Sequence, residues 1–197
     1  MKKTLLLTIF CLGITLSLSA QKSETTLELP LKDDVIFFEN VVQVDSTFSK
    51  KQLFAKGREW FVNYYKSAND VLQMDDKEEG VLIGKGLHKY NFFNGINSSS
   101  IALYFTVNLT VKDGKYRYQI YNFNGMNTNR SALDALSSTP SGPTVSEVNF
   151  DTEYKNLLTE KSRAKYRTKL LSGLQNEVLL IVTSLEKAMK GKSKSEF

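Results

Sequence analysis

Large apolar side chains occupy every second position of residues 101–111 and alternate strictly with Ala102, Tyr104, Thr106, Asn108 and Thr110. This period of two places the large apolar side chains on one face of a β-strand. The run ends at Lys112-Asp113-Gly114-Lys115, and an Asp-Gly pair is typical of a two-residue hairpin turn. The sequence therefore predicts a half-buried antiparallel strand that returns through residues 115–123.

The turn also predicts which residues of the two strands face each other. If Lys112 pairs with Lys115, three aromatic or β-branched pairs fall on one face of the sheet. These pairs are Val111 with Tyr116, Leu109 with Tyr118, and Val107 with Ile120. We expect this face to form the core beneath the helices.

The opposite face of the hairpin combines amide and hydroxyl side chains with aromatic rings and one arginine. The expected pairs are Thr110 with Arg117, Asn108 with Gln119, Thr106 with Tyr121, and Tyr104 with Phe123. Aromatic rings contribute contact area and amides contribute direction, so such a face can bind a ligand or partner. An ordinary solvated sheet face, or one covered by a loop, is the alternative. The candidate binding residues are Tyr104, Thr106, Asn108, Arg117, Gln119, Tyr121 and Phe123.

Other patterns predict the remaining elements of one α+β domain, residues 33–190. A first strand spans residues 35–44, with a bulge near Glu39-Asn40, and a helix spans residues 50–66 behind a Ser49/Gln52 capping box. Two short strands, residues 71–74 and 81–87, flank an acidic turn. Residues 124–148 are rich in Asn, Ser, Thr, Gly and Pro and predict a long flexible loop, and residues 149–190 follow a helical pattern. Residues 21–32 form a polar lead and residues 191–197 a polar tail.

The first twenty residues have the pattern of a secretory signal peptide. Lys2 and Lys3 precede a mostly apolar run, residues 5–18, that ends at Ser19-Ala20. We expect cleavage after Ala20, or after Ser19, and export to the periplasm or the medium. The run is shorter than the roughly 20 apolar residues of a membrane span, so we expect no transmembrane segment after cleavage.

Removing this segment changes the composition. The full chain has 26 basic and 21 acidic residues, and losing Lys2 and Lys3 lowers the net charge from +5 to +3. Cys11, the single cysteine, is also lost, so we expect a disulfide-free domain. An uncleaved anchor, or a lipoprotein acylated at Cys11, is the alternative. A surplus of three charges is not typical of a nucleic-acid-binding protein.

Two motifs could suggest a catalytic site, but each lacks the residues or spacing that such a site requires. Gly84-Lys85-Gly86 is not followed by Ser or Thr and lies in a predicted strand, so structural glycines are expected instead of a phosphate loop. His88, the single histidine, has Ser98-Ser99-Ser100 nearby in sequence, but a catalytic triad needs a spatial arrangement that sequence proximity does not supply. We expect no catalytic residue and no cofactor.

Two charged segments are also expected to be structural or solvated. The acidic residues at 75, 76, 78 and 79 lack the spacing of a calcium loop, so a hairpin turn and no metal site are expected. Basic residues recur at every second position from Lys161 to Lys169. On a helix this spacing spreads them around the surface, with weak contact to an anionic lipid or polysaccharide as the alternative.

The order of elements and several short motifs resemble a family of exported Bacteroidota proteins, a domain of unknown function with a TATA-binding-protein-like (TBP-like) fold. The resemblance covers about residues 34–124. It is carried by Val41-Val42-Gln43-Val44-Asp45, the helix with Trp60, Gly80-Val81-Leu82-Ile83-Gly84-Lys85-Gly86, and the strand leading into Val111-Lys112-Asp113-Gly114-Lys115-Tyr116-Arg117-Tyr118. It implies a β-α-β(4)-α order, with two helices on one face of an antiparallel sheet. DNA binding does not follow from a likeness in fold.

Together these observations favour a non-enzymatic binding or assembly module of the cell envelope that uses its open sheet face. The expected partner is an envelope protein or a glycan, and not a nucleic acid. A structural homodimer formed through the same face is the alternative, and a hydrolase built on His88 is a third hypothesis.

Overall fold

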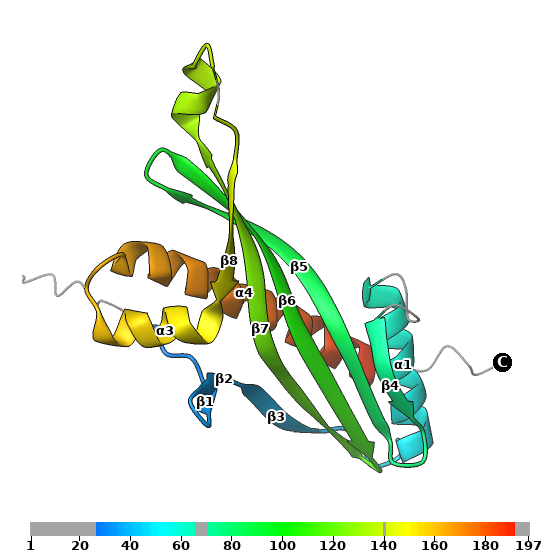
Figure 1. Cartoon of the computed structure of the whole chain (residues 1–197). Coiled ribbons are helices and arrows are strands. Elements are labelled where there is room, and N and C mark those ends of the chain that lie inside the picture. Colours follow the sequence, from blue (N-terminus) through cyan, green and yellow to red (C-terminus); the bar gives the residue numbers. More distant parts are fainter. Residues whose placement is uncertain (1–26, 66–70, 140, 192–197) are drawn as a thin grey trace, which may run out of the picture.

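The computed structural model describes residues 27–65, 71–139 and 141–191. Its six-stranded sheet contains β3 (Phe38–Gln43), β4 (Leu72–Asp76), β5 (Val81–Asn94), β6 (Asn97–Lys112), β7 (Lys115–Ser131) and β8 (Thr144–Asn149). The strand order is β3-β7-β6-β5-β4, and β8 pairs with the distal half of β7 (Figure 1). All of these pairs are antiparallel, which confirms the expected α+β, TBP-like antiparallel architecture.

The central hairpin has the predicted register over its lower half. Lys112 pairs with Lys115, and the pairing continues without a shift to Thr106 and Tyr121. Leu109 and Tyr118 lie opposite each other on the buried face. The Asp-Gly turn thus sets which side chains face the core, because a slip of one residue would turn every apolar side chain outward.

The prediction of a loop over residues 124–148 is wrong for most of that segment. β7 continues to Ser131, the short 3-10 helix η1 covers Ala132–Leu136, and β8 returns along β7. Hydrogen bonds accommodate part of the polar composition of this segment, although the buried Oδ1 of Asn127 has no partner among the described residues. Asn127 is buried and donates from Nδ2 to the Tyr166 hydroxyl at 2.7 Å.

The first strand is also shorter than predicted. β2 (Val35–Ile36) and β3 are separate strands on either side of Phe37, and β3 pairs with β7 in continuous register without a bulge at Glu39-Asn40. Upstream, β1 (Leu31–Lys32) pairs with β2.

The described part of the predicted polar lead is anchored in the fold. Leu29 is buried, and its backbone N–H donates to the Tyr154 hydroxyl at 2.9 Å. The backbone N–H of Ile36 donates to Oδ1 of Asp151 at 2.8 Å. The predicted signal peptide and residues 192–197 of the predicted tail lie outside the described residues.

Helix α1 (Lys50–Tyr65) begins at the predicted capping box. The backbone N–H of Ser49 donates to Oε1 of Gln52 at 2.9 Å, and the backbone N–H of Gln52 donates to Oγ of Ser49 at 3.3 Å. These bonds satisfy amides that the first helical turn leaves without partners. One face of α1, which includes Trp60 and Phe61, is buried.

The predicted helix over residues 149–190 consists of two helices, so the described residues contain three α-helices instead of the expected two. These are α3 (Phe150–Thr159) and α4 (Ala164–Lys190). Arg163, at the start of α4, has a φ of 54°, a left-handed conformation that interrupts the helical path. The guanidinium of the buried Arg167 joins the two helices, 3.0 Å from Glu153 and 3.2 Å from Glu160. Arg167 therefore does not belong to a solvated basic surface.

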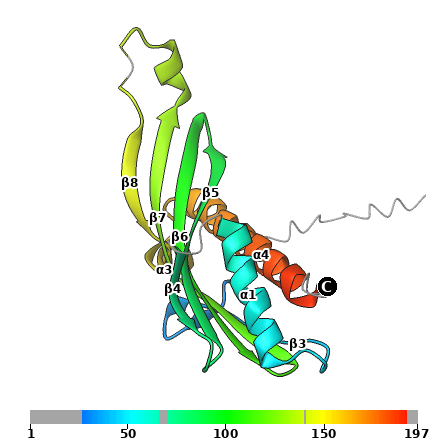
Figure 2. The same cartoon turned by 90° about the vertical axis from the view of Figure 1, so that its right-hand side faces the viewer.

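Helices α1 and α4 lie on one side of the sheet, which we call the inner face (Figure 2). Their close approach depends on glycines. A Cβ atom at Gly84 would lie 2.6 Å from Cε1 of Phe61, and one at Gly173 would lie 2.2 Å from the Tyr90 ring. Gly84 thus allows α1 to pack directly on β5, as expected for a structural glycine. The core side chains of α4 form one buried stripe, which contains Leu170, Leu171, Leu174, Val178, Ile181, Leu185 and Met189.

Candidate functional site

The opposite side of the sheet, which we call the outer face, carries six of the seven predicted binding residues. Tyr104, Thr106 and Asn108 lie on β6, and Arg117, Gln119 and Tyr121 lie on β7. No described helix packs on this face, because α1, α3 and α4 contact the inner face (Figure 2). Tyr104 is 46% exposed, whereas the small side chain of Thr106 is buried at 7%. The structure thus brings the six residues together, but Thr106 lies beneath its neighbours.

Three neighbouring strands share a row of polar side chains on the outer face. Asn108 donates from Nδ2 to Oε1 of Gln119 at 3.2 Å, and Gln119 donates from Nε2 to Oε1 of Glu39 at 2.9 Å. The same Glu39 oxygen lies 3.5 Å from the guanidinium of Arg117. We call Asn108, Gln119 and Glu39 the polar row. Its hydrogen bonds hold the amide groups in fixed orientations.

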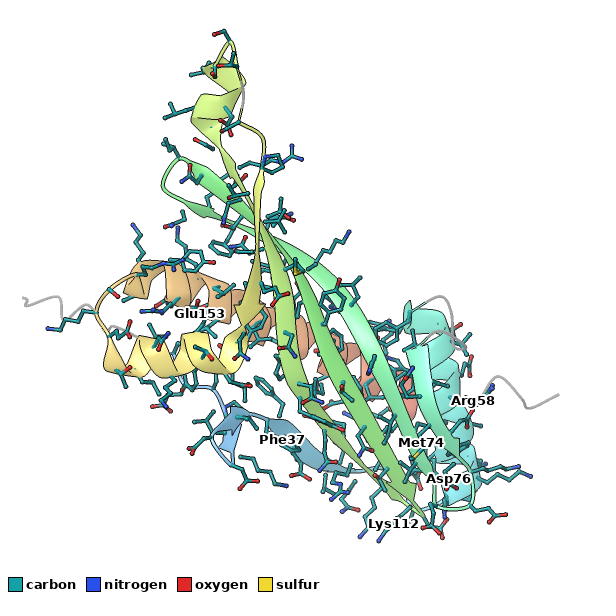
Figure 3. The ribbon with its side chains drawn as sticks, viewed as in Figure 1. Phe37, Arg58, Met74, Asp76, Lys112 and Glu153 are labelled. Atoms are coloured by element: carbon teal, nitrogen blue, oxygen red, sulfur yellow. The ribbon has the colours of Figure 1, made fainter. Side chains whose placement is uncertain are left out.

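Aromatic side chains lie on the outer face above the polar row. The Tyr121 ring stacks on Phe37, with 5.4 Å between ring centroids. Figure 3 shows Phe37 in the chain segment that leads into β3. Tyr104 lines a hollow of about 480 Å³ together with residues of β7 and β8. These rings contribute apolar contact area next to directional polar groups.

Phe123, the seventh predicted binding residue, lies on the inner face and is 1% exposed. The register shifts between Tyr104 and Thr106, so Tyr104 pairs with Asn124 instead of Phe123. Asn122 has a φ of 58°, and this left-handed residue marks the irregularity. Because the bulge adds one residue to β7, it turns Phe123 inward, where its ring packs edge-on against Phe38.

Several outer-face residues were missed because their strands show less regular patterns. Met74 of β4 and Leu87 of β5 are 47% and 45% exposed, and they extend the apolar area toward the far edge. Figure 3 shows Met74 and Lys112 near the hairpin end of the sheet. Lys112 and Lys115 are absent from the predicted binding residues, although the predicted hairpin pairing puts both on the outer face. The pairing was therefore the sequence signal that could have added them to the site.

His88 lies on the inner face, in a half-buried cluster between the sheet and two helices. Its Nδ1 atom is 2.8 Å from Oε2 of Glu177 in α4. The centroids of the Tyr64 and Phe105 rings lie 5.4 Å and 5.2 Å from the centroid of the imidazole. Burial raises the pKa of the Tyr64 hydroxyl, and the Glu177 carboxylate raises it further. His88 pairs in register with Leu103, whereas Ser98, Ser99 and Ser100 pair with Phe93, Phe92 and Asn91. The strand register therefore does not bring these serines to His88.

Four tyrosines, three buried and one half-buried, pack between the sheet and the helices. Burial raises the pKa values of Tyr65, Tyr90 and Tyr116 well above the usual range, and also that of Tyr166. The Tyr90 hydroxyl donates to the carbonyl of Leu170 at 2.7 Å. The hydroxyls of Tyr65 and Tyr116 have no hydrogen-bond partner among the described residues.

The acidic turn is held by local contacts. Asp75 pairs with Arg58 at 2.7 Å, and Oδ1 of Asp76 accepts from the backbone N–H of Glu79 at 2.9 Å. Within the described ranges, no group of three or more His, Cys, Asp or Glu residues could hold a metal ion.

None of the described helices is both long enough and apolar enough to cross a membrane.

Two solved structures resemble this one. The structure of a DUF4468 family protein from Bacteroides ovatus aligns with a TM-score of 0.54 at 14% identity, covering 86% of this chain and 94% of that one. A TBP-like protein from Parabacteroides distasonis aligns with a TM-score of 0.47 at 12% identity, covering 80% and 96%. No curated protein is significantly similar in sequence.

A family comparison matches the part of the chain that forms most of the sheet. Residues 38–125 match the family described as a domain of unknown function (DUF4468) with TBP-like fold. This range runs from the first residue of β3, through α1 and the four following strands, to the part of β7 just beyond the bulge. Residues 38–125 are therefore similar to the DUF4468 family, whose members are described as having a TBP-like fold.

Proposed function

We propose that the protein is a non-enzymatic binding or assembly module of the cell envelope and that it binds through its outer sheet face. The observation that carries the proposal is the arrangement of this face, which no described helix covers and which displays exposed apolar and aromatic side chains next to the polar row. Exposed apolar area beside oriented polar groups is typical of recognition surfaces.

Replacement of three outer-face residues tests this proposal. The variant Tyr104→Ser/Arg117→Gln/Tyr121→Ser removes two rings and one charge, and its thermal unfolding is measured in parallel. The control, Leu179→Ser/Leu180→Ser, changes two side chains of α4 that are 63% and 57% exposed. We expect the immobilised wild type and the control to retain the same components of an envelope extract, and the folded triple variant to lose them. Equal retention by all three proteins would refute the proposal.

A homodimer through the same face is a second candidate. It is favoured by the exposed apolar side chains of Met74, Leu87 and Tyr104, which lie on three neighbouring strands. Light scattering at high protein concentration distinguishes the two candidates. A wild-type dimer, together with a monomeric Leu87→Ser/Tyr104→Ser variant, would favour the homodimer. A wild-type protein that is monomeric at all concentrations would exclude it.

We further propose that the protein is exported and that the signal peptide is removed. The support is the basic, apolar and small-residue pattern of residues 1–20. Fractionation of the producing cells and N-terminal sequencing test it. We expect an envelope or secreted protein that begins at Gln21 or Ala20, and a cytoplasmic protein that retains Met1 would contradict it.

A further inference from the structure

The hairpin end of the outer face carries three basic side chains in adjacent positions. Lys112 and Lys115 lie directly opposite each other at the end of β6 and the start of β7. Arg117 is the next outward residue on β7 and lies opposite Thr110 and Val41. Lys112 is at the lower end of the sheet in Figure 3.

These charges are incompletely neutralised within the protein. Like charges that face each other across an antiparallel pair are destabilising. Among the described residues, neither Lys112 nor Lys115 forms an ion pair, and Arg117 has only Glu39, at 3.5 Å. The carboxylate of the turn is used elsewhere, because Oδ1 of Asp113 accepts from the backbone N–H of Lys50 at 2.6 Å, at the start of α1.

The basic residues surround a hollow instead of a flat surface. The hollow has a volume of about 310 Å³ and is lined by Val41, Thr110, Lys112, Lys115, Tyr116 and Arg117. We call it the basic hollow. A guanidinium can bind a carboxylate, phosphate or sulfate through two parallel hydrogen bonds, and lysines add positive charge. Val41 supplies an apolar wall, which suits an acidic group attached to a larger molecule.

The polar row begins next to the basic hollow. Gln119 and Asn108 lie two residues along their strands from Arg117 and Thr110, a distance of about 7 Å. Beyond them lie the rings of Tyr121 and Tyr104. Hydroxyl groups can exchange hydrogen bonds with amides, and aromatic rings can pack against the apolar faces of sugars. Charge, amides and rings thus follow one another along the outer face.

We propose that the basic hollow binds the oxyanion of an acidic glycan, whose neighbouring sugar lies along the polar row. This assignment rests on the proposed function, because it names the ligand class of the same outer face.

The test compares binding of tetragalacturonate, inorganic phosphate, a neutral tetrasaccharide and a tetraglutamate peptide by backbone amide chemical shifts. We expect tetragalacturonate to shift Lys112, Lys115, Arg117 and the polar row, phosphate to shift only the hollow, and the neutral sugar to bind more weakly than tetragalacturonate. In Lys112→Gln/Lys115→Gln, tetragalacturonate should bind about tenfold more weakly. The control Lys155→Gln/Lys165→Gln removes the same charge from exposed positions of α3 and α4 and should bind as the wild type does.

Three outcomes would overturn the assignment: no shifts at the basic hollow, equal weakening in both double variants, or tighter binding of tetraglutamate than of tetragalacturonate. A thermal melt controls for folding, since removing the lysine repulsion should leave the variant at least as stable as the wild type.

The two proposals can fail separately. If the glycan does not bind but the Tyr104/Arg117/Tyr121 variant still loses its envelope component, the outer face binds another ligand class and only the glycan assignment is wrong.

Discussion

The side chain of Gln119 donates a hydrogen bond across 2.9 Å to Oε1 of Glu39, and the same carboxylate faces Arg117 at 3.5 Å. Glu39 therefore has two roles on the outer face. It orients the end of the polar row and neutralises part of the charge beside the basic hollow. Because its carboxylate is negatively charged, Glu39 is expected to lower the affinity of the basic hollow for an anion.

Replacing Glu39 with Gln should increase the affinity of the basic hollow for phosphate and tetragalacturonate. The change removes one partly exposed ion pair, and such pairs contribute roughly 0.2–1 kcal/mol, so we expect an increase of about 1.4- to fivefold. The measurement is the same chemical-shift titration. Glu147→Gln is the matched control, because Glu147 is exposed on β8 opposite Met126, far along β7 from Arg117. Unchanged affinity in Glu39→Gln, or the same increase in both variants, would contradict this role.

Gly84→Ala should destabilise the fold. The added methyl would lie 2.6 Å from the Phe61 ring, so α1 or the ring must move. Overpacking of this kind costs about 1–3 kcal/mol in the free energy of unfolding. Denaturant unfolding measures the effect. Gly191→Ala is the control, because its methyl would lie 3.5 Å from the nearest atom, and a loss in Gly84→Ala no larger than in this control would contradict the packing described.

Glu177→Ala should also lower the free energy of unfolding, by about 1–3 kcal/mol, because it leaves the half-buried His88 without its 2.8 Å partner. A double-mutant cycle with His88→Ala isolates the interaction between the two side chains. We expect a measurable coupling energy and unchanged binding at the outer face. Additive effects of the two substitutions would show that the pair does not join α4 to the sheet.

Stability should fall at alkaline pH because of the buried tyrosines. Their pKa values in the folded protein are raised above the unfolded value of about 10, so the unfolded chain loses protons first and stability decreases as the pH rises above that value. Tyr116→Phe should reduce this decrease. At neutral pH it should cost little, because the Tyr116 hydroxyl has no hydrogen-bond partner among the described residues. Identical pH profiles for the variant and the wild type would contradict the assignment to Tyr116.

The local pattern was enough to predict the hairpin and the α1 capping box, because both depend on neighbouring residues. It failed at Phe123, since a bulge at a left-handed Asn122 reverses the alternation without a clear change in composition. It also failed at residues 124–131. A sequence rich in Asn and Thr is typical of loops, but here Asn127 bonds Tyr166, a residue of the C-terminal helix. The His88–Glu177 pair was equally hidden, because it joins residues 89 positions apart.

The central claim is that the outer face is the binding surface. The most direct measurement replaces Tyr104 with the photo-reactive residue benzoylphenylalanine in the producing cells and compares it with the same replacement of Leu179 on α4. Irradiation should link the protein at position 104 to a discrete envelope component and should not do so at position 179. No adduct at position 104, or the same adduct from both positions, would contradict the claim.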